Sequence, residues 1–133
     1  MRNVVPVLLL TLAIFSTAAE RKRKDPLKPP EIEIVEIVVQ RSEGRISLDG
    51  RVKNSGQRPA AGVVLIFDFM APGRQVITSK RGSLETERLE PGEEAEFHVF
   101  AADPVRAVEI QVQAAEGSGR ELKVIKAGPH PIE

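Results

Sequence analysis

Two histidines are the only imidazoles in the chain, and cysteine is absent. His98 falls on the outward side of an alternating apolar segment, and His130 lies between two prolines near the end of the chain. A zinc site needs three or four ligands, most of them His or Cys. The pattern therefore predicts surface histidines and no metal or other cofactor. The lack of cysteine also excludes disulfides and thiol catalysis.

Nucleophilic and carboxylate chemistry are also poorly supported. The sequence contains no Gly-x-Ser-x-Gly motif around a nucleophilic serine. Sugar hydrolysis needs a cleft around two carboxylates, and the chain has no Trp or Tyr to line one. We interpret the densest acidic run as solvent-facing charge that keeps strand edges soluble, and calcium binding by it stays an open alternative. This run comprises Glu85, Glu87, Glu90, Glu93, Glu94 and Glu96.

The composition fits one domain. The chain has 133 residues, of which 41% are hydrophobic and 29% charged, enough for a single packed core. The 19 basic and 19 acidic residues balance, so no overall charge favours nucleic acid. The charge is unevenly placed: residues 20–30 carry 5 basic and 2 acidic residues, whereas 31–133 carry 13 basic and 17 acidic ones.

Residues 1–19 have the layout of a secretory signal peptide. Arg2 precedes an apolar run from Val4 to Phe15, and small residues follow, with cleavage expected after Ala19. The run of 12 residues is short of the roughly 20 that a bilayer span needs, which disfavours the alternative of an uncleaved anchor. We expect an exported protein of the periplasm, cell envelope or extracellular space, with no transmembrane span in the mature chain.

Residues 20–30 form a basic, proline-containing linker. Arg21, Lys22, Arg23 and Lys24 are four adjacent cations, and Pro29-Pro30 favours an extended backbone. A solvated spacer is the favoured interpretation. The alternative is a contact between these four cations and anionic lipid or an envelope polymer.

From Glu31 the apolar residues alternate with a period of two. The face changes near Ile34-Val35, which predicts a bulge. In RISLDGRVKN the apolar residues face inward, and Gly50 shares that side, where a large neighbour could cover it. VVLIFDF is apolar on both faces and predicts a central strand, followed by a hairpin around Pro72-Gly73 and the short return GRQVIT.

Later segments continue the same pattern. VEIQVQA places Val108, Ile110, Val112 and Ala114 inward, and ELKVIK predicts one last strand. About seven short strands with regular turn signals indicate an all-β, antiparallel immunoglobulin-like β-sandwich over residues 31–127, followed by a flexible tail over 128–133.

The segment NSGQRPAAG connects two of these strands. Asn54 and Gly56 tolerate left-handed backbone angles, so a sandwich corner is predicted. Gln57 and Arg58 at its tip are the residues that could touch a partner, together with Arg21, Lys22, Arg23 and Lys24 of the linker.

Around this corner the sequence resembles bacterial extracytoplasmic domains of the FxLYD type and related immunoglobulin-like domains. The resemblance covers roughly residues 32–115 and rests on turn and strand motifs. The matching residues are Gly50, Val52, Asn54, Gly56, Val63, Leu65, Phe67, Asp68, Leu89, Pro91, Gly92, Glu93 and Phe97. The resemblance implies a secreted accessory or interaction domain and carries over no catalytic residue.

We therefore expect an exported, non-catalytic interaction module of the bacterial cell envelope, which binds an unidentified envelope protein or polymer. One alternative is an envelope-associated structural protein tethered by its basic linker, and a more remote one is a small hydrolase. Nucleic acid is not an expected partner.

Overall fold

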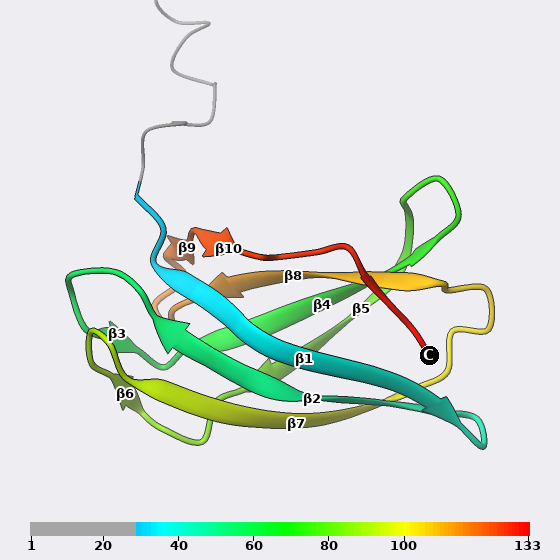
Figure 1. Ribbon diagram of the computed structural model, residues 1–133, viewed down its shortest axis with the longest axis horizontal. Coiled ribbons are helices and arrows are strands. Elements are labelled where there is room, and N and C mark those ends of the chain that lie inside the picture. Colours follow the sequence, from blue (N-terminus) through cyan, green and yellow to red (C-terminus); the bar gives the residue numbers. More distant parts are fainter. Residues whose placement is uncertain (1–28) are drawn as a thin grey trace, which may run out of the picture.

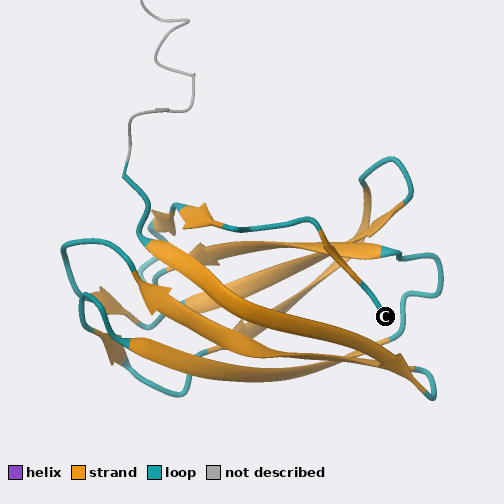
Figure 2. Ribbon diagram, in the orientation of Figure 1, coloured by secondary structure: helices purple, strands orange, loops and turns teal. Residues whose placement is uncertain are grey.

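The computed structural model describes residues 29–133. This part of the chain contains strands, turns and loops but no helix, and hence no helix with the length and apolarity that crossing a membrane requires (Figure 2). Its strands are β1 (Ile32–Ser42), β2 (Arg45–Asn54), β3 (Ala60–Ala61), β4 (Val64–Ala71), β5 (Gln75–Ser83), β6 (Arg88–Leu89), β7 (Glu94–Ala102), β8 (Glu109–Ala115), β9 (Glu121–Leu122), β10 (Val124–Ile125) and β11 (His130–Pro131).

The strands form two principal sheets, which build the β-sandwich that the sequence predicts (Figure 1). One sheet has the order β10-β1-β2-β7, and the other has the order β11-β8-β4-β5, with β9 also paired to β8. The short strands β3 and β6 pair separately. The long strands thus follow the immunoglobulin-like arrangement A-B-E in one sheet and F-C-C′ in the other.

Two local expectations for the first sheet are confirmed. The register of β1 against β2 shifts between Ile34 and Glu36, where a bulge is predicted. Gly50 lies opposite Phe97 in the β2–β7 ladder, and a Cβ at position 50 would come within 2.7 Å of Phe97 Cζ and would also collide with the Glu36 carbonyl oxygen. Glycine at this position makes room for the Phe97 ring in the core.

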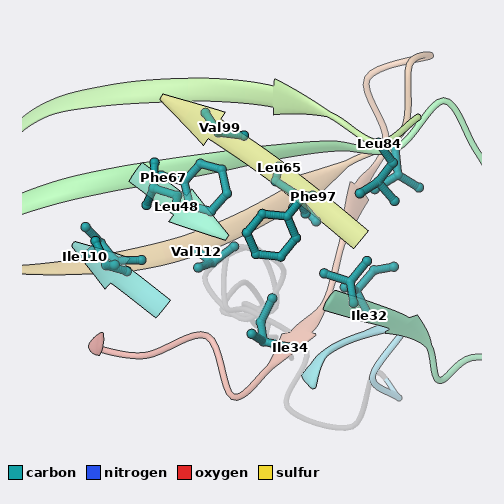
Figure 3. Packing of buried hydrophobic residues seen from close by; sticks show 14 of the residues in the cluster. Ile32, Ile34, Leu48, Leu65, Phe67, Leu84, Phe97, Val99, Ile110 and Val112 are labelled. Carbon is teal, nitrogen blue, oxygen red and sulfur yellow. The ribbon is translucent and has the colours of Figure 1, made fainter. Parts of the chain in front are cut away.

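The core lies between the two sheets and is largely aliphatic (Figure 3). The Phe67 and Phe97 rings, one from each sheet, meet with their centroids 5.6 Å apart. Inward residues alternate with half-buried ones on β2 and mostly with exposed ones on β7, as expected for strands with one solvated face. The largest fully buried side chains include Phe67, Phe69, Ile32, Ile34, Ile46, Leu48, Leu65, Leu89 and Ile110.

The end of the chain differs from the sequence prediction. ELKVIK forms two short strands rather than one, because the chain leaves the second sheet after β9 and pairs with β1 of the first sheet at β10. Residues 128–133 are not a free tail: β11 pairs with β8, and Glu133 exchanges backbone hydrogen bonds with Val39 and Arg41 at 2.9 Å each. These hydrogen bonds close one side of the sandwich.

The inward assignment of Val108 was also wrong. The chain turns at Pro104, whose carbonyl oxygen accepts a hydrogen bond from the Ala107 N–H at 2.7 Å. This turn buries Ala107 in place of Val108, which is 45% exposed. Alternation applies only from Ile110 onward, inside the paired part of β8.

Candidate functional site

The corner that carries Gln57 and Arg58 is built on one buried amide. The side chain of Asn54 is only 1% exposed. Its Nδ2 donates to the carbonyl oxygens of Arg58 at 2.9 Å and Leu89 at 2.8 Å, and its Oδ1 accepts from the Gly56 N–H at 2.9 Å. The amide therefore connects both ends of the corner to the neighbouring β6 region.

The sequence predicts left-handed backbone angles at Asn54 and Gly56, and this prediction is wrong. Neither residue has a positive φ; the left-handed position is Gly62, with φ of 59°. Asn54 is instead a buried side chain whose amide makes three hydrogen bonds. At Gly56 a Cβ would lie 3.4 Å from Asn54 Oδ1. The corner itself forms as predicted, and Gln57 and Arg58 are exposed at its tip.

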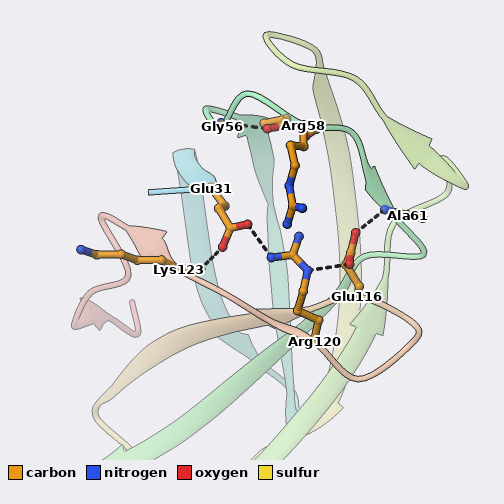
Figure 4. A network of polar contacts seen from close by, with 8 residues as sticks. Glu31, Gly56, Arg58, Ala61, Glu116, Arg120 and Lys123 are labelled. Carbon is orange, nitrogen blue, oxygen red and sulfur yellow. Dashed lines mark hydrogen bonds and ion pairs between the residues drawn. The ribbon is translucent and has the colours of Figure 1, made fainter. Parts of the chain in front are cut away.

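A polar network fastens this corner to the start of the domain (Figure 4). Arg120 Nη1 donates to Glu31 Oε2 at 2.8 Å, and Arg120 Nε donates to Glu116 Oε1 at 2.9 Å. Glu116 Oε2 accepts from the Ala61 N–H at 2.9 Å. One arginine thus joins the residue that follows the linker, the 116–120 turn and the end of the corner.

The network shifts the protonation equilibria of its members. The Ala61 N–H, and then Arg120, hold the pKa of Glu116 below its usual range. The two carboxylates raise the pKa of Arg120. Both Glu116 and Arg120 are therefore charged at neutral pH, and their pairing stabilises the fold rather than providing a group that exchanges protons near pH 7.

A shallow depression of about 380 Å³ lies over this network, lined by Arg58, Pro59, Ala61, Arg88, Glu116 and Arg120. Of its three guanidinium groups, that of Arg120 is held by the two carboxylates, and Arg88 Nε lies 2.6 Å from Glu90 Oε2. Most of the positive charge is therefore neutralised locally. The lining of the depression is therefore polar and rich in ion pairs.

His98 lies on the outer face of the first sheet, as predicted. Its Nδ1 is 2.8 Å from Asp49 Oδ1, and its Nε2 is 3.5 Å from Glu96 Oε1, so the ring faces two carboxylates. The hydrogen bond to Asp49 is the main reason that its pKa is raised. His130 lies on the other sheet, in β11.

The acidic run is distributed among separate partners. Glu94 lies 3.7 Å from Arg51, and the Glu90 N–H donates to Glu93 Oε1 at 2.8 Å. Within residues 29–133 no group of three or more His, Cys, Asp or Glu side chains is placed to hold a metal ion, so the calcium alternative gains no ligand set there.

Besides the corner, the free edge of β5 is a second exposed surface. The return strand β5 has nine residues and pairs only with β4, so its other edge is free of any strand of residues 29–133. Every residue of β5 except Gly82 is exposed, including Val76 at 54% and Ile77 at 42%. In the sequence, the exposure of β5 is indicated by QVITSKRGS, in which apolar and polar residues do not alternate.

The charged residues along this edge are all basic. Residues 74–83 contain Arg74, Lys80 and Arg81 and no acidic residue. At Gly82 the strand lies close to the other sheet, because a Cβ there would lie 2.5 Å from Val99 Cγ2. Glycine at this position lets β5 lie against β7 there, while the remainder of β5 stays exposed.

The four linker cations Arg21, Lys22, Arg23 and Lys24, and the expected signal peptide, lie outside the described residues. The structure therefore brings Arg58 to the Arg120 network, leaves Gln57 exposed at the corner tip, and places β5 as a separate surface. The network does not follow from local motifs, because its contacts join residues that are distant in sequence.

Comparisons with known proteins give weak likenesses. No protein-family model matches the chain. The structure of IrmA from Escherichia coli is similar over 77% of this chain and 95% of IrmA, with a TM-score of 0.48 and 7% sequence identity. The alkylpurine DNA glycosylase AlkC from Pseudomonas fluorescens, bound to DNA containing an abasic site analogue, is similar over 71% of this chain, with a TM-score of 0.41 and 16% identity. This chain spans 30% of AlkC. At these TM-scores neither likeness assigns an activity or a ligand.

Proposed function

We propose that the protein is an exported, non-catalytic interaction module of the bacterial cell envelope, and that it binds a partner protein through the free edge of β5. The observation that carries this proposal is the exposed nine-residue strand, which pairs with β4 on one side only. A free strand edge presents a row of backbone N–H and C=O groups to which an extended segment can add.

The side chains of β5 support the same role. Val76 and Ile77 offer apolar surface that a partner strand would cover. With nine residues and no proline, β5 lacks two of the features that block strand addition, and its protection against indiscriminate pairing comes from the charges of Lys80 and Arg81. Backbone pairing supplies affinity in this mode of binding, whereas the side chains select the partner.

Site-specific photo-crosslinking in the native envelope tests the proposal. A photoreactive residue at Ser79 on β5 is compared with one at Gln113, an exposed control on β8, and one at Gln57 at the corner tip. We expect the same discrete partner band from Ser79 in repeated experiments and no such band from Gln113. Bands from Gln57 alone would move the binding surface to the corner, and identical patterns from all three positions would refute a specific partner.

Export is tested separately by determining the first residue of the protein recovered from the envelope or the medium. The signal-peptide hypothesis expects it to begin at Glu20. A chain that still begins at Met1 would contradict cleavage.

A further inference from the structure

The free edge of β5 carries two adjacent cations on opposite faces. Lys80 pairs in register with Phe67, and Arg81 with Ile66, across the β4–β5 ladder. Phe67 is fully buried, whereas Ile66 lies on the other side of β4. Since paired residues share a face of the sheet, Lys80 belongs to the inner face and Arg81 to the outer one.

From this arrangement we propose that the edge of β5 binds an extended acidic segment of a partner protein, with one carboxylate beside Lys80 and the next beside Arg81. The inference rests on the proposed function and adds the chemistry of the partner. Successive residues of an added strand point to opposite faces, so two consecutive acidic residues would reach both cations at once.

Both cations are available for such pairing. Lys80 and Arg81 are exposed, and neither forms an ion pair within residues 29–133. The carboxylate on the neighbouring strand, that of Asp68, accepts hydrogen bonds from Ser79 and Gln113. An added strand must partly remove the two cations from water, which favours a segment that brings opposite charge.

Lys80 also discriminates against other segments. A charged side chain on the inner face of an edge strand opposes pairing with apolar strands, because it would be buried without a partner. A carboxylate opposite Lys80 removes that penalty. The same residue can therefore block indiscriminate strand addition and admit an acidic partner.

Val76 and Ile77, at the other end of β5, determine the order of acidic and apolar residues expected in the partner segment. Antiparallel addition is the more stable and more common geometry. A segment running antiparallel to β5 meets Arg81 first, then Lys80, and reaches Ile77 and Val76 after two intervening residues. The expected pattern is therefore two acidic residues, any two residues, and two apolar residues, in that order.

A second copy of the chain is a poorer occupant. Antiparallel pairing of two β5 strands about Ser79 would bring two copies of Lys80 and two of Arg81 along one short ladder. Like charges on neighbouring cross-strand positions are destabilising, and the β5 segment contains no acidic residue to offset them. An acidic segment of another protein meets no such repulsion.

The test uses the 15N-labelled protein, as processed by the cells, titrated with synthetic peptides at millimolar concentrations. The probe is Ser-Glu-Glu-Thr-Thr-Val-Val-Ser, and its matched control replaces both glutamates with lysine. We expect the acidic peptide to shift the NMR signals of β5 amides and to bind about tenfold more tightly than the basic one.

Charge reversal in the protein provides the second arm. The double variant Lys80→Glu/Arg81→Glu should reverse the preference and bind the lysine peptide, while Arg58→Glu at the corner should leave the preference unchanged. Equal binding of both peptides, shifts away from β5, no binding, or a concentration-dependent dimer through β5 would each overturn the proposal. If the peptides fail but Ser79 still crosslinks to a partner, the proposed function stands and only the acidic partner is refuted.

Discussion

Replacing Asn54 by alanine tests whether the buried amide is what holds the corner in place. The change removes three hydrogen bonds and leaves the backbone bonds of residue 54 to Glu93 and Gly92 intact. Leaving the buried Leu89 carbonyl unpaired costs about 1–3 kcal/mol, and each of the two partly buried bonds contributes roughly 0.5–1.5 kcal/mol. We therefore expect a loss of about 3 kcal/mol, a large part of the ~5–15 kcal/mol of a typical domain.

Urea unfolding measures this loss directly. With a typical slope, the transition midpoint should fall by about 2 M, and the melting temperature by roughly 12 °C. The matched control is Ser55→Ala, since Ser55 Oγ is buried and has no hydrogen-bond partner within residues 29–133. That variant should change stability by less than about 0.5 kcal/mol. If Asn54→Ala costs no more than Ser55→Ala, the amide does not support the corner and the reasoning is wrong.

Three further predictions concern other parts of the chain. Gly50→Ala should destabilise the domain by roughly 2–3 kcal/mol in the same urea assay, because the new methyl group would displace the Phe97 ring and the adjacent strand; a neutral result would contradict this packing. The raised pKa of His98 means that its contribution to stability is fully present below its ordinary pKa of 6.5 and is lost as the pH rises through the folded-state value. An NMR titration of the ring should show this raised value, and Asp49→Asn should return it toward 6.5; an unchanged midpoint would exclude Asp49 as the cause. Replacing Arg21–Lys24 by serine should leave envelope association, measured by cell fractionation, unchanged if the linker is a spacer, whereas release into the medium would favour the electrostatic tether.

Features that depend on the alternation within a single strand could be predicted from the sequence. Alternation in RISLDGRVKN gave the buried face of β2, and the break at Ile34-Val35 gave the bulge. Gly50 on the inward face indicated a large neighbour, which is Phe97. These features are local, because the period of two and a missing side chain are visible within one segment.

Features that depend on pairing between distant segments could not be predicted in this way. ELKVIK contains alternation but no sign that its two halves join different sheets. The 128–133 segment is polar and proline-rich, yet its backbone bonds to β8 and β1 hold it in place. The Arg120 network joins residues 31, 61, 116 and 120, and no single motif contains them all.

The contrast between the two sides of the sandwich gives β5 its significance. On one side the C-terminal segment pairs with β8 through β11 and with β1 through β10 and Glu133, so that those edges are covered. On the other side β5 and β7 each end their sheet without a further neighbouring strand in the described part of the chain, and β5 is the more exposed of the two. Closing one side shows that this short chain can cover an edge with its own residues. Lys80 lies on the open edge of β5. Its charge opposes pairing with apolar strands and favours pairing with acidic ones, so strand addition at this edge is selective. The charge-reversal experiment therefore distinguishes an edge that is merely protected, which no peptide should bind in either variant, from an edge that recognises acidic segments.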